Sequence, residues 1–152
     1  MYDIFVVSIA KPILVGIYHN NKLIQTITKD GQTSDILPQI INDILQEKSI
    51  SNIYFVNGPG SYMAIKVAYI FLKTISQIKK INFQACSGFE INNYSPIKAL
   101  GKKYFFIKND GTIYIDILSD TTILHPFVLP DVLDKNIFTS DTLPQYYLPA
   151  VS

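Results

Sequence analysis

The 152-residue sequence contains no arginine, one cysteine and two histidines. All thirteen basic residues are lysine, which excludes bidentate arginine clamps on phosphates or base edges. The single cysteine, Cys86, excludes an internal disulfide and fits a reducing compartment. Because Cys86 ends the apolar run 81–86, we expect it to be a buried structural thiol.

The residue types that build metal and catalytic sites are also scarce. His19 and His125 have no further metal-type ligand at helical or turn spacing, and a zinc site needs three or four ligands. No motif supports a Ser-His-Asp triad, and two glutamates in the whole chain make a glutamate pair improbable. We therefore expect no catalytic residues, no metal and no cofactor.

Long apolar runs are missing as well. No run approaches the roughly 20 residues that a membrane span needs. Residues 1–9 lack the basic segment and the length of a signal peptide. These features predict a cytoplasmic protein without a membrane partner. The net charge of +1 predicts no strong electrostatic attraction to nucleic acid.

Hydrophobic residues make up 48% of the chain, enough for the core of one domain. Apolar β-branched runs predict three strands joined by short turns, which is an antiparallel meander. A helix beginning at Ser34 or Asp35, with either as its cap, follows, and two further strands flank a long helix. The predicted strands cover residues 4–9, 13–18, 23–28, 53–56 and 82–86, and the helices cover residues 34–47 and 61–80.

This β-β-β-α-β-α-β order predicts an α/β fold with a mixed five-stranded sheet. The topology is that of the ribonuclease H-like superfamily of actin, sugar kinases and Hsp70. We expect residues 1–100 to form this lobe. Residues 101–152 would form a reduced second lobe, with a β-hairpin around Asn109-Asp110-Gly111 and an extended tail broken by prolines.

The segment Asn57-Gly58-Pro59-Gly60-Ser61 joins the strand at 53–56 to the long helix. Glycine can adopt φ values closed to other residues, proline fixes its own φ, and Ser61 is a candidate N-cap. The segment therefore fits either a phosphate-binding turn or a tight structural joint. It matches no phosphate loop, dinucleotide fingerprint or nucleophile elbow, so we favour the structural joint.

The long helix is apolar on more than one side. At 100° per residue, one side is expected to pack on the sheet, and it consists of Ala64, Val67, Ala68, Phe71, Ile75 and Ile78. The opposite side carries Lys66, Lys73 and Gln77, flanked by Tyr62, Met63, Tyr69 and Ile70. Such a second apolar side must be covered either by the rest of the chain or by a protein partner.

The segment Val56-Asn57-Gly58-Pro59-Gly60-Ser61-Tyr62 resembles the Gly-Pro-Gly-Ser-Phe-Thr-Gly signature of the TsaB (YeaZ) family of bacterial tRNA threonylcarbamoyladenosine biosynthesis. The segment 34–41, with Leu37-Pro38, resembles the family's first-helix pattern, and the resemblance covers roughly residues 1–95.

Three features depart from the family pattern. Ser8, Ile9 and Ala10 stand where the family has Asp-Thr-Ser, a remnant of the superfamily's phosphate loop. Met63-Ala64-Ile65-Lys66 replaces the Thr-Gly-Leu-Arg that often follows the turn, and the second lobe is shortened. All three changes point away from a self-sufficient nucleotide site.

The resemblance implies a non-catalytic scaffold that pairs with a TsaD-like transferase through helices 34–47 and 61–80. A third, ATPase subunit of the complex is a possible further partner. Because the chain has no arginine, we expect little direct contact with tRNA. By matching, the interface residues would be Tyr62, Met63, Lys66, Tyr69, Ile70 and Lys73.

Two alternatives stay open. One is a small nucleotide-binding enzyme of the actin and sugar kinase superfamily, although Ser8 stands where an acidic residue would organise magnesium. The other is a homodimer that buries the same two helices.

Overall fold

The computed structural model describes residues 1–146, which form a five-stranded sheet, a three-stranded sheet and two α-helices. The strands are β1 (Tyr2–Val7), β2 (Ile13–His19), β3 (Lys22–Lys29), β4 (Ile50–Val56), β5 (Asn82–Cys86), β6 (Ile97–Lys98), β7 (Lys103–Ile107) and β8 (Ile113–Ile117). The helices are α1 (Thr33–Glu47) and α2 (Tyr62–Lys79), with short 3-10 helices η1 (Gly88–Ile91) and η2 (Lys135–Ile137).

The large sheet has the strand order β3-β2-β1-β4-β5. The first three strands pair antiparallel, whereas β4 joins β1 and β5 joins β4 in parallel. Between β2 and β3 the chain turns in two residues, Asn20 and Asn21, whose φ values of 50° and 66° suit a tight hairpin turn. The α/β fold with a mixed five-stranded sheet and two helices, expected from the sequence, is confirmed.

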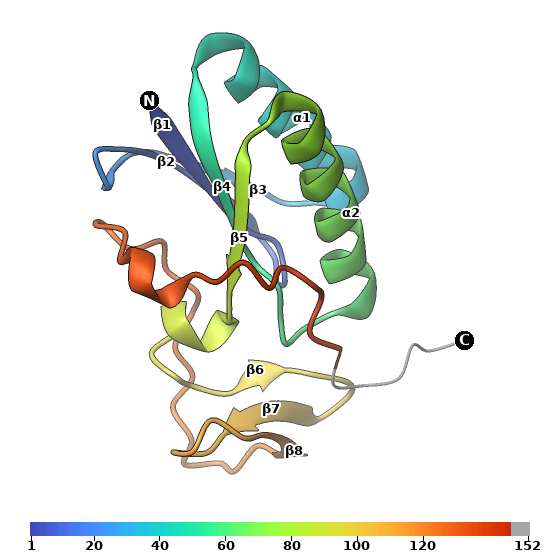
Figure 1. Ribbon diagram of the computed structural model, residues 1–152. Coiled ribbons are helices and arrows are strands. Elements are labelled where there is room, and N and C mark those ends of the chain that lie inside the picture. The colour runs from blue at the N-terminus through green and yellow to red at the C-terminus, as the bar shows by residue number, and fades with distance from the viewer. Residues whose placement is uncertain (147–152) are drawn as a thin grey trace.

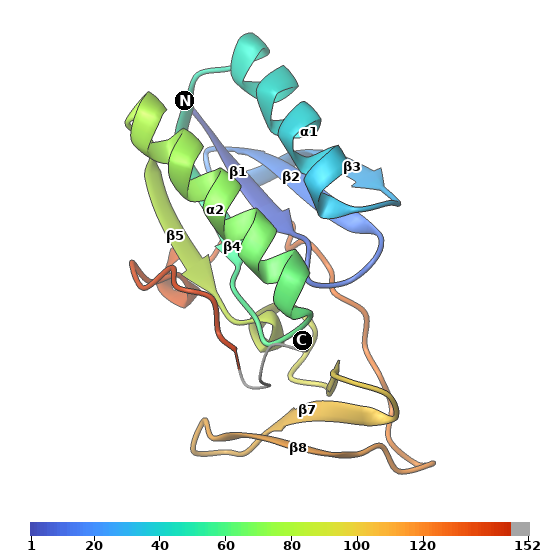
Figure 2. The same cartoon turned by 90° about the vertical axis from the view of Figure 1, so that its right-hand side faces the viewer.

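Both helices cover the same face of this sheet (Figures 1 and 2). From α1, Leu37, Ile41 and Ile44 enter the core between helices and sheet, and α2 contributes Leu72. The expected start of α1 was wrong: the helix begins at Thr33, and its N-cap residue is Gln32, which makes no side-chain capping bond. Ser34 and Asp35 lie inside the first turn, where propensity alone does not distinguish cap from helix.

The central strands β1 and β4 are buried on both faces. Their alternate residues enter two separate clusters, Ile4 and Ile53 on the helix side and Phe5 and Tyr54 on the other side. A sheet with parallel strands of this kind needs cover on each face. The two helices supply one of these layers, so the second must come from elsewhere in the chain.

The second layer is an extended segment, residues 129–145, which we call the C-terminal strap. Figure 1 shows it in orange and red, on the side of the sheet away from α1 and α2. It meets the β2–β3 hairpin, where Leu23 N donates to Asp131 O at 2.9 Å. It reaches the opposite edge at β5, where Thr139 N donates to Ala85 O at 2.8 Å and Ala85 N donates back at 2.9 Å. The strap therefore links the two edges of the sheet.

Between these two edges, the strap is anchored by an aromatic ring. Phe138 is buried, with its ring centroid 4.1 Å from that of Tyr54 in a stacked arrangement and 5.2 Å from that of Phe5 in an edge-on one. Burial, together with the nearby charge of Asp3, raises the pKa of Tyr54 to about 12. The Tyr54 phenol therefore stays protonated at neutral pH.

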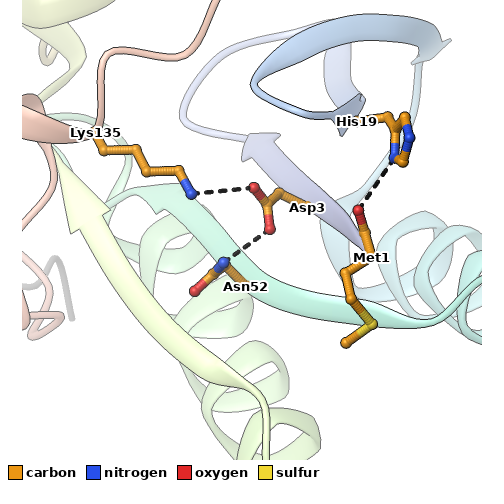
Figure 3. A network of polar contacts seen from close by, with 5 residues as sticks. All are labelled: Met1, Asp3, His19, Asn52 and Lys135. Carbon is orange, nitrogen blue, oxygen red and sulfur yellow. Dashed lines mark hydrogen bonds and ion pairs between the residues drawn. The ribbon is translucent and has the colours of Figure 1, made fainter.

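Asp3, whose charge acts on Tyr54, belongs to a small polar network (Figure 3). Asn52 Nδ2 donates to Asp3 Oδ1 at 2.8 Å, and Lys135 Nζ of the strap lies 3.7 Å from Asp3 Oδ2. The Lys135 side chain is about half exposed, so this ion pair contributes little to stability. The aromatic contacts, rather than the ion pair, hold the strap.

The small sheet, β6-β7-β8, is antiparallel and lies beyond the carboxyl end of β5 (Figure 1). Its core consists of Phe89, Ile97 and Phe105. A division of the chain at residue 100 stays a prediction: β6 precedes that point, and the strap that follows it covers the first sheet. Within residues 1–146, no helix is long and apolar enough to cross a membrane.

We expect Phe138→Ala to lower the free energy of unfolding by about 3–5 kcal/mol, because it removes a buried ring and leaves a cavity against Tyr54. Urea unfolding followed by circular dichroism measures this loss. The matched control is Ile123→Ala, an exposed apolar truncation that should change stability by less than about 0.5 kcal/mol. Equal effects of the two substitutions would show that the strap does not support the sheet.

Candidate functional site

The turn between β4 and α2 is shaped by close backbone approach. Gly58 has a φ of 125°, and a Cβ placed there would lie 2.9 Å from the carbonyl oxygen of Gln145. Gly60 lies against Ile9, and a Cβ placed on Gly60 would be 3.0 Å from the Cβ of Ile9. The Gly58 carbonyl accepts a hydrogen bond from Gly88 N at 2.9 Å, which fixes the turn to the start of η1. These contacts favour the structural interpretation of the turn.

Asn57 connects the turn to the end of the strap. Its side chain is buried and donates through Nδ2 to the carbonyls of Leu143 at 2.9 Å and Asp141 at 3.3 Å. Its own carbonyl accepts from Gln145 N at 2.8 Å. The sequence placed Asn57 in a structural turn but gave no sign of this partner. The only signal of this contact in the sequence was an amide side chain at the end of a buried strand.

Ser8, Ile9 and Ala10 lie at the carboxyl end of β1, at the rim of a cavity of about 430 Å³. The first turns of α1 and α2 line the same cavity, with Ser34 from one helix and Met63 from the other. Ser8 is buried, and its Oγ has no hydrogen-bond partner among residues 1–146. The position predicted to be a degenerate phosphate loop therefore lines a cavity, and the lining residues of this cavity include no carboxylate.

Ser61 occupies the N-cap position of α2, as the sequence suggested, but its side chain makes no capping hydrogen bond. Gln32 at α1 likewise leaves the helix N-terminus without a side-chain cap. Both helix N-termini line the cavity beside Ser8. Free N–H groups at such positions attract anions or water.

The face of α2 that meets the sheet agrees only in part with the expected one, since Phe71 and Ile75 pack against the core beside Ala68. The buried residues are Ile65, Ala68, Leu72 and Ser76. Of the expected set, Ala68 is buried, whereas Ile78 is 67% exposed. The helix is apolar almost all round, so a wheel does not identify the sheet-facing side. The small residues Ala68 and Ser76, which allow close approach, were the better signal.

The predicted interface residues separate into two groups. Tyr62, Lys66, Tyr69 and Lys73 follow one flank of α2. The Tyr69 ring lies 6.4 Å from the rings of Phe55 and Phe83, and Lys73 Nζ lies 6.0 Å from the Tyr69 ring. Tyr69 is therefore partly engaged in the core, which limits its share in any interface.

The flank continues into the strap end at the start of α2. Tyr62 is half-buried, with its ring centroid 4.6 Å from that of Tyr146. Lys66 Nζ lies 5.8 Å from the centroid of the Tyr62 ring. This end of the predicted interface thus has partial cover from the chain itself.

The second group points outward. Met63 is 61% exposed and Ile70 is 52% exposed, and Val67 and Ile78 lie on the same side of the helix. We call Met63, Val67, Ile70 and Ile78 the α2 outer stripe. Met63, Ile70 and Ile78 are each more than half exposed, whereas Val67 is half-buried and lines the cavity beside Ser8. For these three exposed residues, the possibility that the rest of the chain buries this side is not supported within residues 1–146.

The residues of metal and thiol chemistry are separated in space. Within the described part of the chain, no three histidine, cysteine or acidic side chains converge as a metal site would require. His19 Nδ1 lies 3.2 Å from the Met1 carbonyl oxygen, at the far end of the sheet (Figure 3). Burial, with the nearby charge of Glu90, raises the pKa of the Cys86 thiol. This environment fits a structural thiol.

The fold and the exposed helix define a class: an α/β protein whose mixed β3-β2-β1-β4-β5 sheet carries two helices on one face. The structures with this fold include YeaZ from Pseudomonas aeruginosa, with a TM-score of 0.60 and 12% sequence identity. Another is a protein described as uncharacterized with similarity to peptidase YEAZ from Pseudomonas aeruginosa, with a TM-score of 0.63 and 12% identity.

These two similarities cover 82% and 80% of this chain, and 66% and 69% of the other chains. The chain thus spans just under two thirds of the first structure. No protein-family model and no curated protein matches the sequence. At this identity the similarity shows a shared fold, and function has to be argued from the surface.

We expect Gly58→Ala to destabilise the protein by about 2–3 kcal/mol, because the methyl group meets the Gln145 carbonyl and the φ of 125° is strained for alanine. The matched control is Gly101→Ala, at a φ of 62° with open space around it, which should cost about 1 kcal/mol. Chemical unfolding of both variants measures the difference. Equal losses would mean that the turn has room for a side chain.

Cys86 should resist thiol reagents in the folded protein at pH 8, since the thiol is 4% exposed and its pKa is raised. Reaction with a chromogenic disulfide is expected only on unfolding, with one thiol released per chain. Rapid labelling of the native protein would show that the carboxyl end of β5 opens to solvent.

Proposed function

We propose that this chain is a non-catalytic scaffold subunit of ribonuclease H-like fold. In this proposal it pairs with a TsaD-like transferase in the cytoplasm, in threonylcarbamoyladenosine modification of tRNA. The observation that carries the proposal is the α2 outer stripe. A single exposed apolar residue needs no explanation, but a row along one side of an 18-residue helix is typical of a protein interface.

The stripe has the spacing of a helix-packing surface. Met63, Val67, Ile70 and Ile78 follow one another at intervals of four, three and eight residues, so they form one ridge along α2. A partner helix laid along this ridge would bury the side chains that the chain leaves in water. Met63 adds a flexible side chain that adapts to the contours of a partner.

The charges around the stripe are distributed unevenly between the two helices. The exposed face of α1 carries Asp35, Asp43 and Glu47, whereas α2 has lysines and no carboxylate between its ends. A partner that crosses both helices should therefore present basic groups toward α1 and acidic groups toward α2. The charges would set the orientation, and the apolar ridge would supply most of the affinity.

Two further features support this assignment. The fold is that of solved YeaZ structures, and the turn at residues 57–61 resembles the signature of the TsaB family. The non-catalytic role is part of the proposal because Ser8 stands where the superfamily places a carboxylate. Contact with a third, ATPase subunit and a minor direct role for tRNA binding also belong to it.

A nucleotide-binding enzyme is the second candidate, favoured by the cavity beside Ser8. Its volume of about 430 Å³ and the two uncapped helix N-termini suit an anionic ligand. Calorimetric titration of the isolated chain with ATP and magnesium tests it. Binding in the micromolar range would support the enzyme and weaken the scaffold interpretation.

We expect the double variant Met63→Glu, Ile70→Glu to lose the complex with the TsaD-like protein of the same organism, because two charges would enter an apolar contact. Co-expression followed by size-exclusion chromatography with light scattering measures complex formation. Both residues are more than half exposed, so the monomer should fold normally. Tyr69 is avoided because its ring packs on Phe55 and Phe83.

The matched control is Ile24→Glu, Ile123→Glu, which adds the same charges at exposed apolar positions outside α2. The control should form the one-to-one complex as the wild type does. Native pairing by the α2 variant would rule out the stripe as the interface. The isolated wild type could also form a homodimer. If the α2 variant fails to form that homodimer, the two helices mediate self-association.

A further inference from the structure

The two sheets have four edge strands, and three of these edges are approached by other parts of the chain. The strap forms isolated bridges with β5 at Ala85 and with β3 at Lys22. Near the start of β6, Ser95 Oγ accepts a hydrogen bond from His125 N at 3.0 Å, so the segment at His125 lies there. The fourth edge, β8, pairs with no further strand or isolated bridge among residues 1–146.

β8 lies at the end of the molecule farthest from the large sheet (Figures 1 and 2). Its sequence is Ile-Tyr-Ile-Asp-Ile, and it pairs with β7 without a register shift. Edge strands usually avoid pairing with other chains through lysine, proline or a bulge, and β8 has none of these. By contrast, the edge strand β3 begins and ends with lysine. β8 is therefore accessible and suited to pair with another strand.

The open edge is formed by the backbone of Ile113, Ile115 and Ile117. In an antiparallel pair, successive residues direct their N–H and C=O groups alternately toward the partner strand and away from it. Lys108 N donates to Thr112 O at 2.9 Å, so Thr112 and every second residue after it face β7. The three isoleucines between these positions direct their backbone groups away from β7.

β8 is complementary to itself in antiparallel orientation. If Ile115 lies opposite Ile115 of a second copy, Ile113 lies opposite Ile117 of that copy, and the outward backbone groups of both strands meet. The same register brings the isoleucine side chains of the two strands together on one face. Ile113 and Ile115 already pack on the core of the small sheet, whereas Ile117 is 65% exposed and would gain cover.

On the opposite face, this register is complementary in charge. Asp116 lies opposite Tyr114 of the second copy, and Lys108 Nζ lies 5.5 Å from the centroid of the Tyr114 ring in each chain. The carboxylate of one copy therefore approaches a lysine of the other, and no like charges stand opposite each other. Asp116 Oδ1 accepts from Ile117 N at 2.7 Å, an exposed contact that the pairing would exchange for contacts between strands.

We propose that two copies of this chain pair through β8, antiparallel about Ile115, and form one continuous sheet with the order β6-β7-β8-β8-β7-β6. The backbone hydrogen bonds and the isoleucines supply the affinity, and Asp116 fixes the register. A strand of five residues buries little surface, so the pairing is weak and depends on concentration. It leaves the α2 outer stripe free for a different partner.

Amide hydrogen exchange of the full-length ¹⁵N-labelled protein tests the contact directly. Tyr114 and Asp116 should exchange slowly at every concentration, because their N–H groups face β7. Ile113 and Ile115 should exchange fast at about 20 µM and at least about threefold more slowly at about 1 mM, as expected for a dimer Kd near 0.1 mM. Light scattering over the same range should show the dimer.

The same measurements on the Met63→Glu, Ile70→Glu variant separate this pairing from contacts through the helices. That variant alters α2 and leaves β8 unchanged. We expect it to dimerise as the wild type does, whether or not it binds the TsaD-like protein. The two proposals can therefore fail independently.

Two substitutions in β8 test the residues. Ile115→Pro removes a donor that faces the second copy and leaves the bonds between β8 and β7 in place, so it should abolish the dimer. Asp116→Lys should weaken the dimer about fivefold, because it would face Lys108 beside Tyr114 of the second copy. The matched control Asp120→Lys makes the same charge change at an exposed residue outside β8 and should leave the dimer unchanged. If Ile115→Pro does not fold, the two aspartate variants still decide.

Several outcomes would overturn the proposal. A monomer at about 1 mM would do so. Slow exchange of Ile113 and Ile115 at every concentration would also do so, because the edge would then be covered within a single chain. A dimer that the β8 variants form and the α2 variant loses would place self-association on the helices. Equal effects of the two aspartate variants would remove the role of Asp116.

Discussion

The large sheet must be covered on both faces, because β1 and β4 place apolar side chains on each side. Two helices cover one face, and the chain has no further helix of comparable length within residues 1–146. The strap solves this by lying across the other face in extended form. Phe138 packs on Tyr54 and Phe5 at its centre, and Asn57 holds its end by side-chain and backbone hydrogen bonds. The cover of this face of the large sheet depends on this contact.

The strap also explains why the α2 outer stripe is free. Residues 129–145 are used on the opposite face, and the Tyr146 ring packs on Tyr62 at the start of the helix. Met63 and Ile70 are therefore more than half exposed within the described structure. The fold thus supports the proposed scaffold role through the apolar side chains that it leaves exposed on α2.

The order of strands and helices could be predicted from the sequence because each depends on local patterns. β5 follows from the apolar run before Cys86, and the β2–β3 hairpin follows from Asn20-Asn21. The side of α2 that meets the sheet could be predicted only in part, because apolar residues surround the helix. The strap's position depends on long-range contacts such as Phe138 on Tyr54, which leave no periodic pattern.

The most direct measurement is a methyl spectrum of the isoleucine- and methionine-labelled protein, titrated with the TsaD-like protein of the same organism. The stripe carries Met63, Ile70 and Ile78, while Ile24 and Ile123 report on surfaces outside α2. We expect the three stripe signals to shift or broaden at one equivalent and the two others to stay in place. Unchanged stripe signals, in a sample where light scattering shows that a complex has formed, would contradict the assignment of α2 as the pairing surface.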